Sequence, residues 1–452
     1  MSNKFIEIDR AKAITLPENM EGFLDQNSLA RFIVDVVEQL DTSELEKSYR
    51  GGGSAPYPPK MMLSLLFYCY ATGIFSSCKI EQATYELIPV LYITGGTHPD
   101  HDSINTFRKR FLEQLSALFV QILEYACEMG ILKLGNISID GSKIKANASK
   151  HKAMSWDYAN KLEKQLQEEI ATLMAQAEAG EDNQATKIDI PSELKRREER
   201  LAKIAEVKAE LEKRAQERYD QEKAEYDAKM AEREEKEKAR GRKLGGKKPQ
   251  APEPGPKAKD QVNFTDEASR IMPVAGGGFE QAYNTQATVD IETMLIVGEH
   301  VSQNTNDKQE VEPALSELEK LPEHLGKVEK AALDSGYFSE ANIQRFDEAE
   351  IEAYIPAGRQ HHNLTLEERF APAPELPENP DMAATMNHRL KTEAGKAFYA
   401  KRKSTVEPVF GIIKEVMGFR QFMLRGFQAV QGEWTLVCIA FNLKRLCNLS
   451  CS

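Results

Sequence analysis

A long, highly charged segment interrupts this chain and constrains its fold more than any other feature. Residues 151–250 hold 23 Lys and Arg and 23 Asp and Glu. Apolar residues recur there every three or four positions in two runs, Leu162, Leu166, Ile170 and Leu173, then Leu194, Leu201, Ile204, Val207 and Leu211. Pro191 and a polar stretch separate the runs. This pattern predicts two helices paired as an antiparallel coiled-coil hairpin.

The sequence on either side indicates that the hairpin is an insertion. Residues 136–147 begin as a β-strand, in which Ile137 and Ile139 alternate with polar residues, and the strand is expected to break at Asp140-Gly141. β-rich sequence resumes near Val262, after a Gly-, Pro- and Lys-rich stretch. We therefore predict four parts, which are an N-terminal helical domain (1–130), a second domain (131–150 and 261–446), the inserted hairpin (151–240) and a linker (241–260).

The order of elements predicts the fold of the interrupted domain. Strands are expected at 280–290 and 294–302, as a hairpin, and at 327–333 and 351–355; helices are expected at 308–321, 340–350 and 389–418, and a proline-containing loop at 359–386. One strand, a hairpin and two further strand–helix units make a mixed sheet flanked by helices. This is the strand order of an RNase H-like fold. The predicted class is therefore α/β, with an N-terminal all-α domain and the inserted helical hairpin.

The N-terminal part reads as helical between residues 20 and 130. Residues 60–71 are apolar on most sides and follow Pro58-Pro59, which predicts a buried helix. Another helix is expected to start with Asp102 as its N-cap and to continue to Gly130. Its first turns carry Arg108, Lys109 and Arg110. A basic helix in a small helical domain suits docking onto DNA, although an ordinary solvated face explains the same residues.

Charge and cysteine content exclude several classes of protein. The formal charge of −12 argues against a general nucleic-acid coat protein. The charge is uneven, because 301–380 holds seven basic against seventeen acidic residues, whereas 388–425 holds nine against three. The six cysteines form no CxxC pair, which favours free thiols in a reducing compartment over a zinc site. No signal peptide or bilayer-length apolar run is evident, so we expect a cytoplasmic protein with no membrane partner.

Three carboxylates are the candidate functional groups. Asp140 and Asp334 are each expected at the end of a strand, and Glu407 on the long helix that follows. Adjacent parallel strands would bring the two aspartates to one sheet edge, and a helix packed on the sheet would add the glutamate. Three carboxylates without His or Cys suit Mg²⁺ or Mn²⁺. Two such ions can activate a water or a 3′-hydroxyl and stabilise the leaving oxygen in phosphoryl transfer.

Each carboxylate also has an ordinary explanation when taken alone. Asp140-Gly141 is a common turn pair, and Asp334-Ser335-Gly336 is compatible with another turn, followed by Ser339 as a helix cap. Glu407 is compatible with an exposed helix position. It is their joint order, strand, strand and helix, that favours a shared site.

The chain resembles the DDE transposases of bacterial insertion sequences. The resemblance extends over nearly the whole chain and includes the N-terminal PDHDSINTFRKRF at 99–111. It rests mainly on DGSKIKANASKHKAMS (140–155), NFTDEASRIM (263–272), GGFEQAYNTQATVD (277–290), LDSGYFSEANI (333–343) and VEPVFGIIKEVMGFRQFMLRG (406–426). It implies that Asp140, Asp334 and Glu407 are catalytic metal ligands for two Mg²⁺ ions, which Mn²⁺ can replace.

The resemblance also implies roles for several cations. The family's Tyr–Arg–Glu–Lys signature places a lysine seven residues after the acid, where Lys414 stands. Upstream, Tyr399 lies eight residues before Glu407, and the cation role stays open between Arg402 and Lys403. Asn304, Asn306 and Asp307 either line the same edge or cap the helix expected at 308. The predicted DNA contacts are Lys414, Arg402, Lys403, Arg108 and Arg110.

The implied function is cleavage and strand transfer at the terminal inverted repeats of the element that encodes the chain. Its partner is double-stranded DNA, both element ends and target, and the working form is a homodimer associated with the nucleoid. Three alternatives remain, which are a catalytically silent, domesticated DNA-binding protein, a structural coiled-coil protein and an RNase H-like nuclease without strand transfer. The hairpin either dimerises the chain or reaches across DNA.

Overall fold

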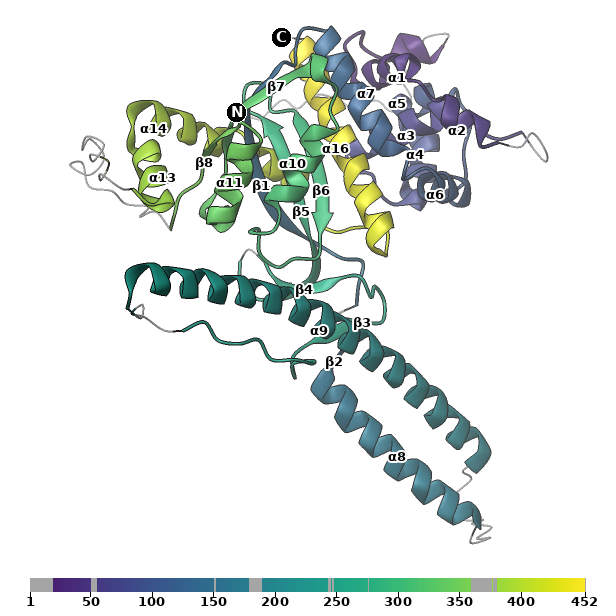
Figure 1. Cartoon of the computed structure of the whole chain (residues 1–452). Coiled ribbons are helices and arrows are strands. Elements are labelled where there is room, and N and C mark those ends of the chain that lie inside the picture. The colour runs from purple at the N-terminus through teal and green to yellow at the C-terminus, as the bar shows by residue number, and fades with distance from the viewer. Residues whose placement is uncertain are drawn as a thin grey trace, which may run out of the picture. The chain divides into compact units, whose positions relative to one another are not determined.

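The chain divides into two compact units, and Figure 1 shows the elements of each. The computed structural model describes residues 19–49, 55–149, 152–178, 189–242, 248–274, 276–358 and 380–451, together with Gly245 and Leu376. One unit comprises Met1–Lys145 and Tyr283–Ser452, and the other comprises Ala146–Ala282. The second unit therefore contains the whole segment in which the sequence predicts an inserted hairpin.

The first unit contains a mixed β-sheet. Its strands are β1 (Leu134–Lys145), β5 (Phe279–Asp290), β6 (Ile296–Ser302), β7 (Gly326–Ala332) and β8 (Glu352–Tyr354). The sheet runs β5-β1-β7-β8, with β6 paired to β5. β1 is parallel to β7, β7 is parallel to β8, and β5 is antiparallel to β6. The prediction of a mixed sheet in an α/β chain is confirmed.

The predicted break in the first strand is wrong. β1 continues through Asp140 and Gly141 to Lys145. β1 pairs with β7 on one side and with β5 on the other. The pairing with β5 is shown by Ile291 N, which donates to Asn136 O, and by Thr285 Oγ1, which donates to Ser142 O (2.7 Å). Residue numbers rise along one strand as they fall along the other, so β1 and β5 are antiparallel. Asp140 therefore stands within a paired strand and not at a turn.

Several helices cover this sheet, and they are shorter than expected. α10 (Val311–Glu319) follows β6, and α11 (Glu340–Glu348) follows β7 with Ser339 as its N-cap, as predicted. The single helix expected over 389–418 is wrong. The chain forms α13 (Met382–Lys391), α14 (Glu393–Ala400), a 3₁₀ helix (Lys401–Ser404), α15 (Val406–Gly411) and a π-helical turn (Ile412–Val416). Of the loop expected over 359–386, residues 382–386 are helical, and most of the rest lies outside the described residues.

Thr392 causes the first of these breaks. It ends α13, and its hydroxyl then accepts a hydrogen bond from Gly395 N (3.0 Å) as the N-cap of α14. A side chain that caps a new helix competes with continuation of the old one.

The N-terminal part of the first unit is helical, as predicted. It contains α1 (Leu29–Gln39), α2 (Ser43–Lys47), α3 (Pro59–Ala71), α4 (Ser77–Glu86), α5 (Ile88–Thr94), α6 (His101–Arg110) and α7 (Leu115–Glu128). α3 is buried on most sides. The helix expected from Asp102 to Gly130 is two helices, α6 and α7, and the N-cap is Asp100, whose carboxylate accepts from Ser103 N (2.8 Å).

The C-terminal helix joins the two parts of this unit. α16 (Phe427–Ser450) contacts α3 and α7 on one side and β6 on the other, and Figure 1 shows it between the sheet and the N-terminal helices. Its buried residues include Trp434, whose indole N–H donates to Gln286 O (3.1 Å). The helix is therefore a shared core element.

The second unit is built on two long helices. α8 (Trp156–Glu178) and α9 (Ile190–Arg240) stand where the sequence predicts the hairpin. They bury a common apolar cluster of Ala159, Leu162, Leu166, Ile204, Val207 and Leu211, joined by Met154 and Val262. The last two residues come from β2 (Ala153–Ser155) and β3 (Gln261–Asn263), which pair antiparallel, while β4 (Arg270–Pro273) pairs with residues 279–282 of β5.

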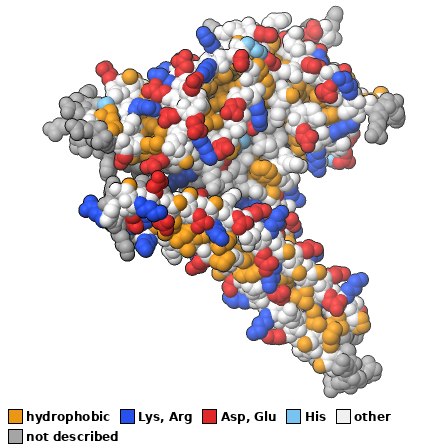
Figure 2. Space-filling view, viewed as in Figure 1, with side chains coloured by type: hydrophobic (Ala, Val, Ile, Leu, Met, Phe, Trp, Pro, Cys, Tyr) orange, Lys and Arg blue, Asp and Glu red, His pale blue; other side chains and the backbone are white. Residues whose placement is uncertain are grey.

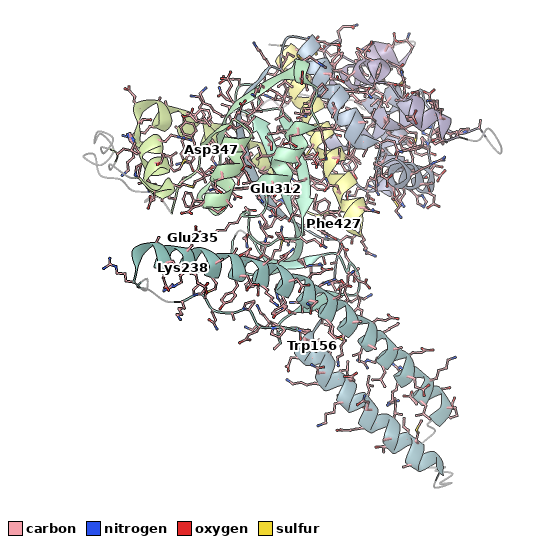
Figure 3. All side chains as sticks on the ribbon, in the orientation of Figure 1. Trp156, Glu235, Lys238, Glu312, Asp347 and Phe427 are labelled. Carbon is pink, nitrogen blue, oxygen red and sulfur yellow. The ribbon has the colours of Figure 1, made fainter. Side chains whose placement is uncertain are left out.

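The surface of this unit follows its sequence pattern. Figure 2 shows apolar side chains in a band along the two helices, with charged side chains flanking it. In Figure 3, Trp156 lies where α8 begins, while Glu235 and Lys238 lie near the end of α9. Among the helices of the described residues, none is long and apolar enough to cross a membrane.

Glu299 on β6 makes the unfolding free energy depend on pH. Burial raises its pKa to about 8, against an unfolded value near 4.3. Between those values the folded state holds a proton that the unfolded state releases, so stability falls as pH rises. In the wild type, this group makes the free energy of unfolding fall by about 1.4 kcal/mol per pH unit between roughly pH 5 and 8. We expect this fall to be absent in Glu299→Gln when both proteins are unfolded in urea.

The exposed Glu319→Gln on α10 is the matched control and is expected to follow the wild-type pH profile. Equal slopes for wild type and Glu299→Gln would contradict a buried, protonated Glu299.

Candidate active site

The parallel pairing of β1 and β7 brings two of the predicted acids to the same edge of the sheet. Ile137 faces Ala331 and Ser138 faces Ala332 in register. Two residues further along each chain stand Asp140 and Asp334. Asp334 lies just past β7, where its carboxylate accepts a hydrogen bond from Gly336 N (2.7 Å) and starts a 3₁₀ turn at Ser335–Tyr337. The turn expected at Asp334 is thus present, and the turn does not remove the carboxylate from the edge.

The third acid joins this edge through an arginine. Arg402 Nη2 lies 2.7 Å from Asp140 Oδ2, and its Nη1 lies 2.9 Å from Glu407 Oε1. The Arg402 side chain is only 11% exposed, whereas that of Glu407 is 47% exposed. Of the two upstream cations left open by the sequence, Arg402 contacts the acids, and Lys403 is exposed beside it.

Burial dominates the electrostatics of Asp140. Burial raises its pKa to about 6, with Asp334 and Asp307 adding to the rise and the Arg402 guanidinium opposing it. Burial also raises the pKa of the nearby Tyr399 to about 12, so its hydroxyl stays neutral at physiological pH. Burial disfavours the ionised form of this carboxylate, so any additional positive charge beside it stabilises that form.

Asp307, one of the residues left open in the sequence, is the centre of a polar cluster whose other members the sequence did not single out. Asp307 Oδ1 accepts hydrogen bonds from Asn284 Nδ2 (2.8 Å), Gln286 Nε2 (3.0 Å) and Lys143 Nζ (3.0 Å). The buried Tyr337 hydroxyl donates to Gln286 Oε1. Asp307 therefore lines the edge and does not cap the next helix, which begins at Val311. The available signal was the alternation of polar residues in β5, which puts Asn284 and Gln286 on one face.

Gly141 lets this cluster approach β1. A Cβ atom at this position would collide with the Gln286 side-chain amide and stand 2.9 Å from Asp307 Oδ1. We expect Gly141→Ala to lower the free energy of unfolding by about 1–3 kcal/mol, because the packed polar groups must shift. Gly135→Ala in the same strand meets nothing within 4 Å and is expected to stay within about 1 kcal/mol of wild type. Equal losses in chemical denaturation would contradict the close approach.

Lys414 stands on the other side of β1. Its Nζ donates to Ser142 Oγ and to Lys143 O (3.2 Å). Burial lowers its pKa, and the neighbouring Lys143 adds to the effect. The lysine is thus anchored to the two residues that follow Gly141 in the strand, and it is not a free surface lysine.

The two N-terminal arginines have different surroundings. Arg108 is 5% exposed, and its guanidinium donates to Tyr70 Oη (2.8 Å) and Phe75 O (2.9 Å). Tyr70 in turn donates to Glu433 Oε1 (2.8 Å) on α16. Arg108 is thus occupied in the interior. Arg110 is exposed, with its guanidinium 4.9 Å from the centre of the Tyr49 ring.

The donor chemistry of the three acids fits a hard cation. Asp140, Asp334 and Glu407 offer only carboxylate oxygens, which Mg²⁺ and Mn²⁺ prefer. Within the described part of the chain, no three His, Cys, Asp or Glu side chains converge closely enough to hold a metal ion. At this edge, the guanidinium of Arg402 is the cation that bridges Asp140 and Glu407.

Comparison with known proteins gives two family matches. Residues 375–447 match the family described as transposase DDE domain, and residues 18–110 match the family described as transposase domain (DUF772). No curated protein and no solved structure matches the chain. Glu407, Arg402, Lys403 and Lys414 lie inside the first match, whereas Asp140 and Asp334 lie outside both.

Both matches are to transposase families, one at each end of an α/β chain, and together they support an insertion-sequence DDE transposase.

Proposed function

We propose that this transposase cleaves DNA at the terminal inverted repeats of its own insertion sequence and joins the freed ends to target DNA. The observation that carries the proposal is the β1–β7 register, whose last pair, Ser138 and Ala332, lies two residues before Asp140 on one strand and two residues before Asp334 on the other. Glu407 is linked to the same edge through Arg402. The match to the transposase DDE domain over residues 375–447 supports the third acid.

The catalytic domain has an RNase H-like fold in this proposal. The strand path β5-β1-β7-β8, with β6 paired antiparallel to β5 and parallel pairing of β1 with β7 and of β7 with β8, supports it. In this sheet Asp334 follows the carboxyl end of β7, and Asp140 lies inside the longer β1, two residues past its last pair with β7. The helical residues 1–130 form the end-recognition domain, and the α8–α9 hairpin is an insertion into the catalytic domain.

The chemistry follows from the residues at the edge. Asp140, Asp334 and Glu407 hold the divalent metal, Mg²⁺ or Mn²⁺. When bound, two such ions supply the Lewis-acid activation of water or of a 3′-hydroxyl and stabilise the leaving oxygen. Asn284, Gln286 and Lys143 keep Asp307 fixed behind Asp140. Asp140 is partly buried and is held by Arg402 and by Gly141 N, whereas the more exposed Glu407 would be the ligand that solvent and DNA reach.

DNA contacts come from cations around this edge. Lys414, Arg402 and Lys403 hold phosphates near the acids, and Arg110 is the exposed arginine of the N-terminal helices. Phosphate contacts of this kind make affinity fall steeply with salt. Two element ends must be processed together, so the working form is a homodimer on chromosomal DNA.

The experiment uses a duplex that carries one end of the encoding element with its flanking DNA, incubated with the full chain and Mg²⁺ together with a target plasmid. We expect nicks with 3′-hydroxyl ends at the element boundary, followed by joined products. Specific binding without nicks would overturn the enzyme and favour a domesticated DNA-binding protein. Nicks without joined products would favour a nuclease.

A further inference from the structure

The bridge that Arg402 makes between two acids suggests a role in metal loading. One guanidinium contacts Asp140 Oδ2 at 2.7 Å and Glu407 Oε1 at 2.9 Å. These are two of the three oxygen groups that the proposed function assigns to the metal. The same carboxylate oxygens cannot give their full charge to an ion and to the guanidinium together.

We propose that Arg402 is an internal counter-ion that competes with the divalent metal for Asp140 and Glu407, and so sets the metal affinity of the site. The inference rests on the proposed function, since it takes these acids as the metal ligands. In the metal-free protein the guanidinium holds the two carboxylates, and metal binding displaces it. The released guanidinium then serves as a DNA phosphate contact.

Two further observations indicate that this bridge is built to open. Arg402 Nε is buried and, within the described part of the chain, has no hydrogen-bond partner. The bridge therefore leaves one donor unsatisfied, which favours states in which the side chain has moved. The Glu407 end of the bridge is 47% exposed, so an ion reaches it from solvent.

The position of Arg402 also makes displacement a local event. It lies on the short 3₁₀ helix Lys401–Ser404, between α14 and α15, and not within a long helix. A change of side-chain rotamer, or of this one turn, removes the guanidinium from both acids. The sheet strands that carry Asp140 and precede Asp334 need not move.

The test measures Mn²⁺ binding to the full-length, DNA-free protein, from the paramagnetic resonance signal of the unbound ion. If the bridged state is populated at about 90–99%, its removal tightens the apparent Kd by about 10- to 100-fold. We expect this gain for Arg402→Gln. A smaller gain is expected for Arg402→Lys, because an ammonium cannot bond both acids with the fixed fork of a guanidinium.

Lys401→Gln is the matched control. This substitution removes one positive charge from the same 3₁₀ helix. In the wild type the Lys401 ammonium pairs with Glu292 at 2.7 Å and not with the candidate ligands. Its Mn²⁺ affinity is expected to stay within about twofold of wild type, since distant exposed charges are screened. A similar gain in Lys401→Gln would mean that overall charge sets the affinity, which would overturn a specific role for Arg402.

Asp140→Asn and Asp334→Asn separate failure of this inference from failure of the proposed function. If both lose Mn²⁺ binding while Arg402→Gln binds as wild type or more weakly, the counter-ion role is overturned and the metal site stands. If neither aspartate variant changes Mn²⁺ binding, the metal site itself is wrong and the inference falls with it. Thermal unfolding in EDTA supplies a second readout, in which Arg402→Gln unfolds at a lower temperature and gains more from Mn²⁺ than wild type.

Discussion

Asp334→Asn is expected to lower the rate of strand cleavage by at least about a thousandfold while the fold stays intact. The fold survives because an asparagine side-chain oxygen can still accept the hydrogen bond that Gly336 N now donates to Asp334 Oδ1. Catalysis fails because a neutral amide is a poor ligand for Mg²⁺ and leaves developing charge in the transition state unbalanced. Single-turnover cleavage of the element-end duplex measures the effect.

The control for this substitution is Asp347→Asn on α11, an exposed acid that is labelled in Figure 3. It removes the same charge away from the sheet edge and is expected to cleave as wild type does. DNA affinity of Asp334→Asn is expected to be unchanged or slightly higher. Cleavage by Asp334→Asn at the wild-type rate would remove this residue from the site.

The second large effect is expected at Glu433, in the interior of the first unit. Glu433 is fully buried, and its Oε2 accepts hydrogen bonds from Met423 N and Leu424 N, each 2.9 Å away. Its Oε1 accepts from the Tyr70 hydroxyl, which also receives Arg108 Nη1. Glu433→Ala leaves a buried cation without its anion and two backbone donors unpaired. We expect a loss of about 3–5 kcal/mol in unfolding free energy.

Two variants calibrate this loss in urea or thermal unfolding. Tyr70→Phe removes one hydroxyl and keeps the anion, so about 1–2 kcal/mol is expected. Gln428→Ala, exposed on the same helix, is expected to stay within about 0.5 kcal/mol of wild type. If Glu433→Ala cost no more than Gln428→Ala, the buried network would not be holding α3, α6 and α16 together.

The sequence predicted the elements that carry the acids but not how they meet. Hydrophobic alternation located β1, a strand was also expected at 327–333, where β7 lies, and the strand order indicated that Asp140 and Asp334 belong at one edge. The expected break at Gly141 was wrong, because a glycine in a strand reads as a turn until its partner is known. What requires it is the approach of Gln286 and Asp307, which lie more than 140 residues away in the sequence.

The cations show more clearly that the sequence alone does not tell which distant residues come into contact. Helical spacing puts Arg108 and Arg110 in one basic stretch, and nothing in that stretch distinguishes them. Arg108 is buried because Tyr70 and Glu433, from two distant helices, provide its partners. Likewise, the choice between Arg402 and Lys403 depends on which of them faces β1, and the 3₁₀ geometry of Lys401–Ser404 sets that direction. Long-range packing, not local propensity, decides both cases.

The most direct test of the central claim, that Asp140, Asp334 and Glu407 bind the metal that cleaves DNA, is a change of ligand chemistry at Asp334. Asp334→Cys replaces a carboxylate with a softer thiolate, which Mg²⁺ binds poorly and which the less hard Mn²⁺ tolerates better. We predict that Asp334→Cys cleaves the element-end duplex at least about a hundredfold more slowly than wild type in Mg²⁺ and recovers most of that loss in Mn²⁺. Cleavage by Asp334→Cys in Mg²⁺ at the wild-type rate would contradict the claim.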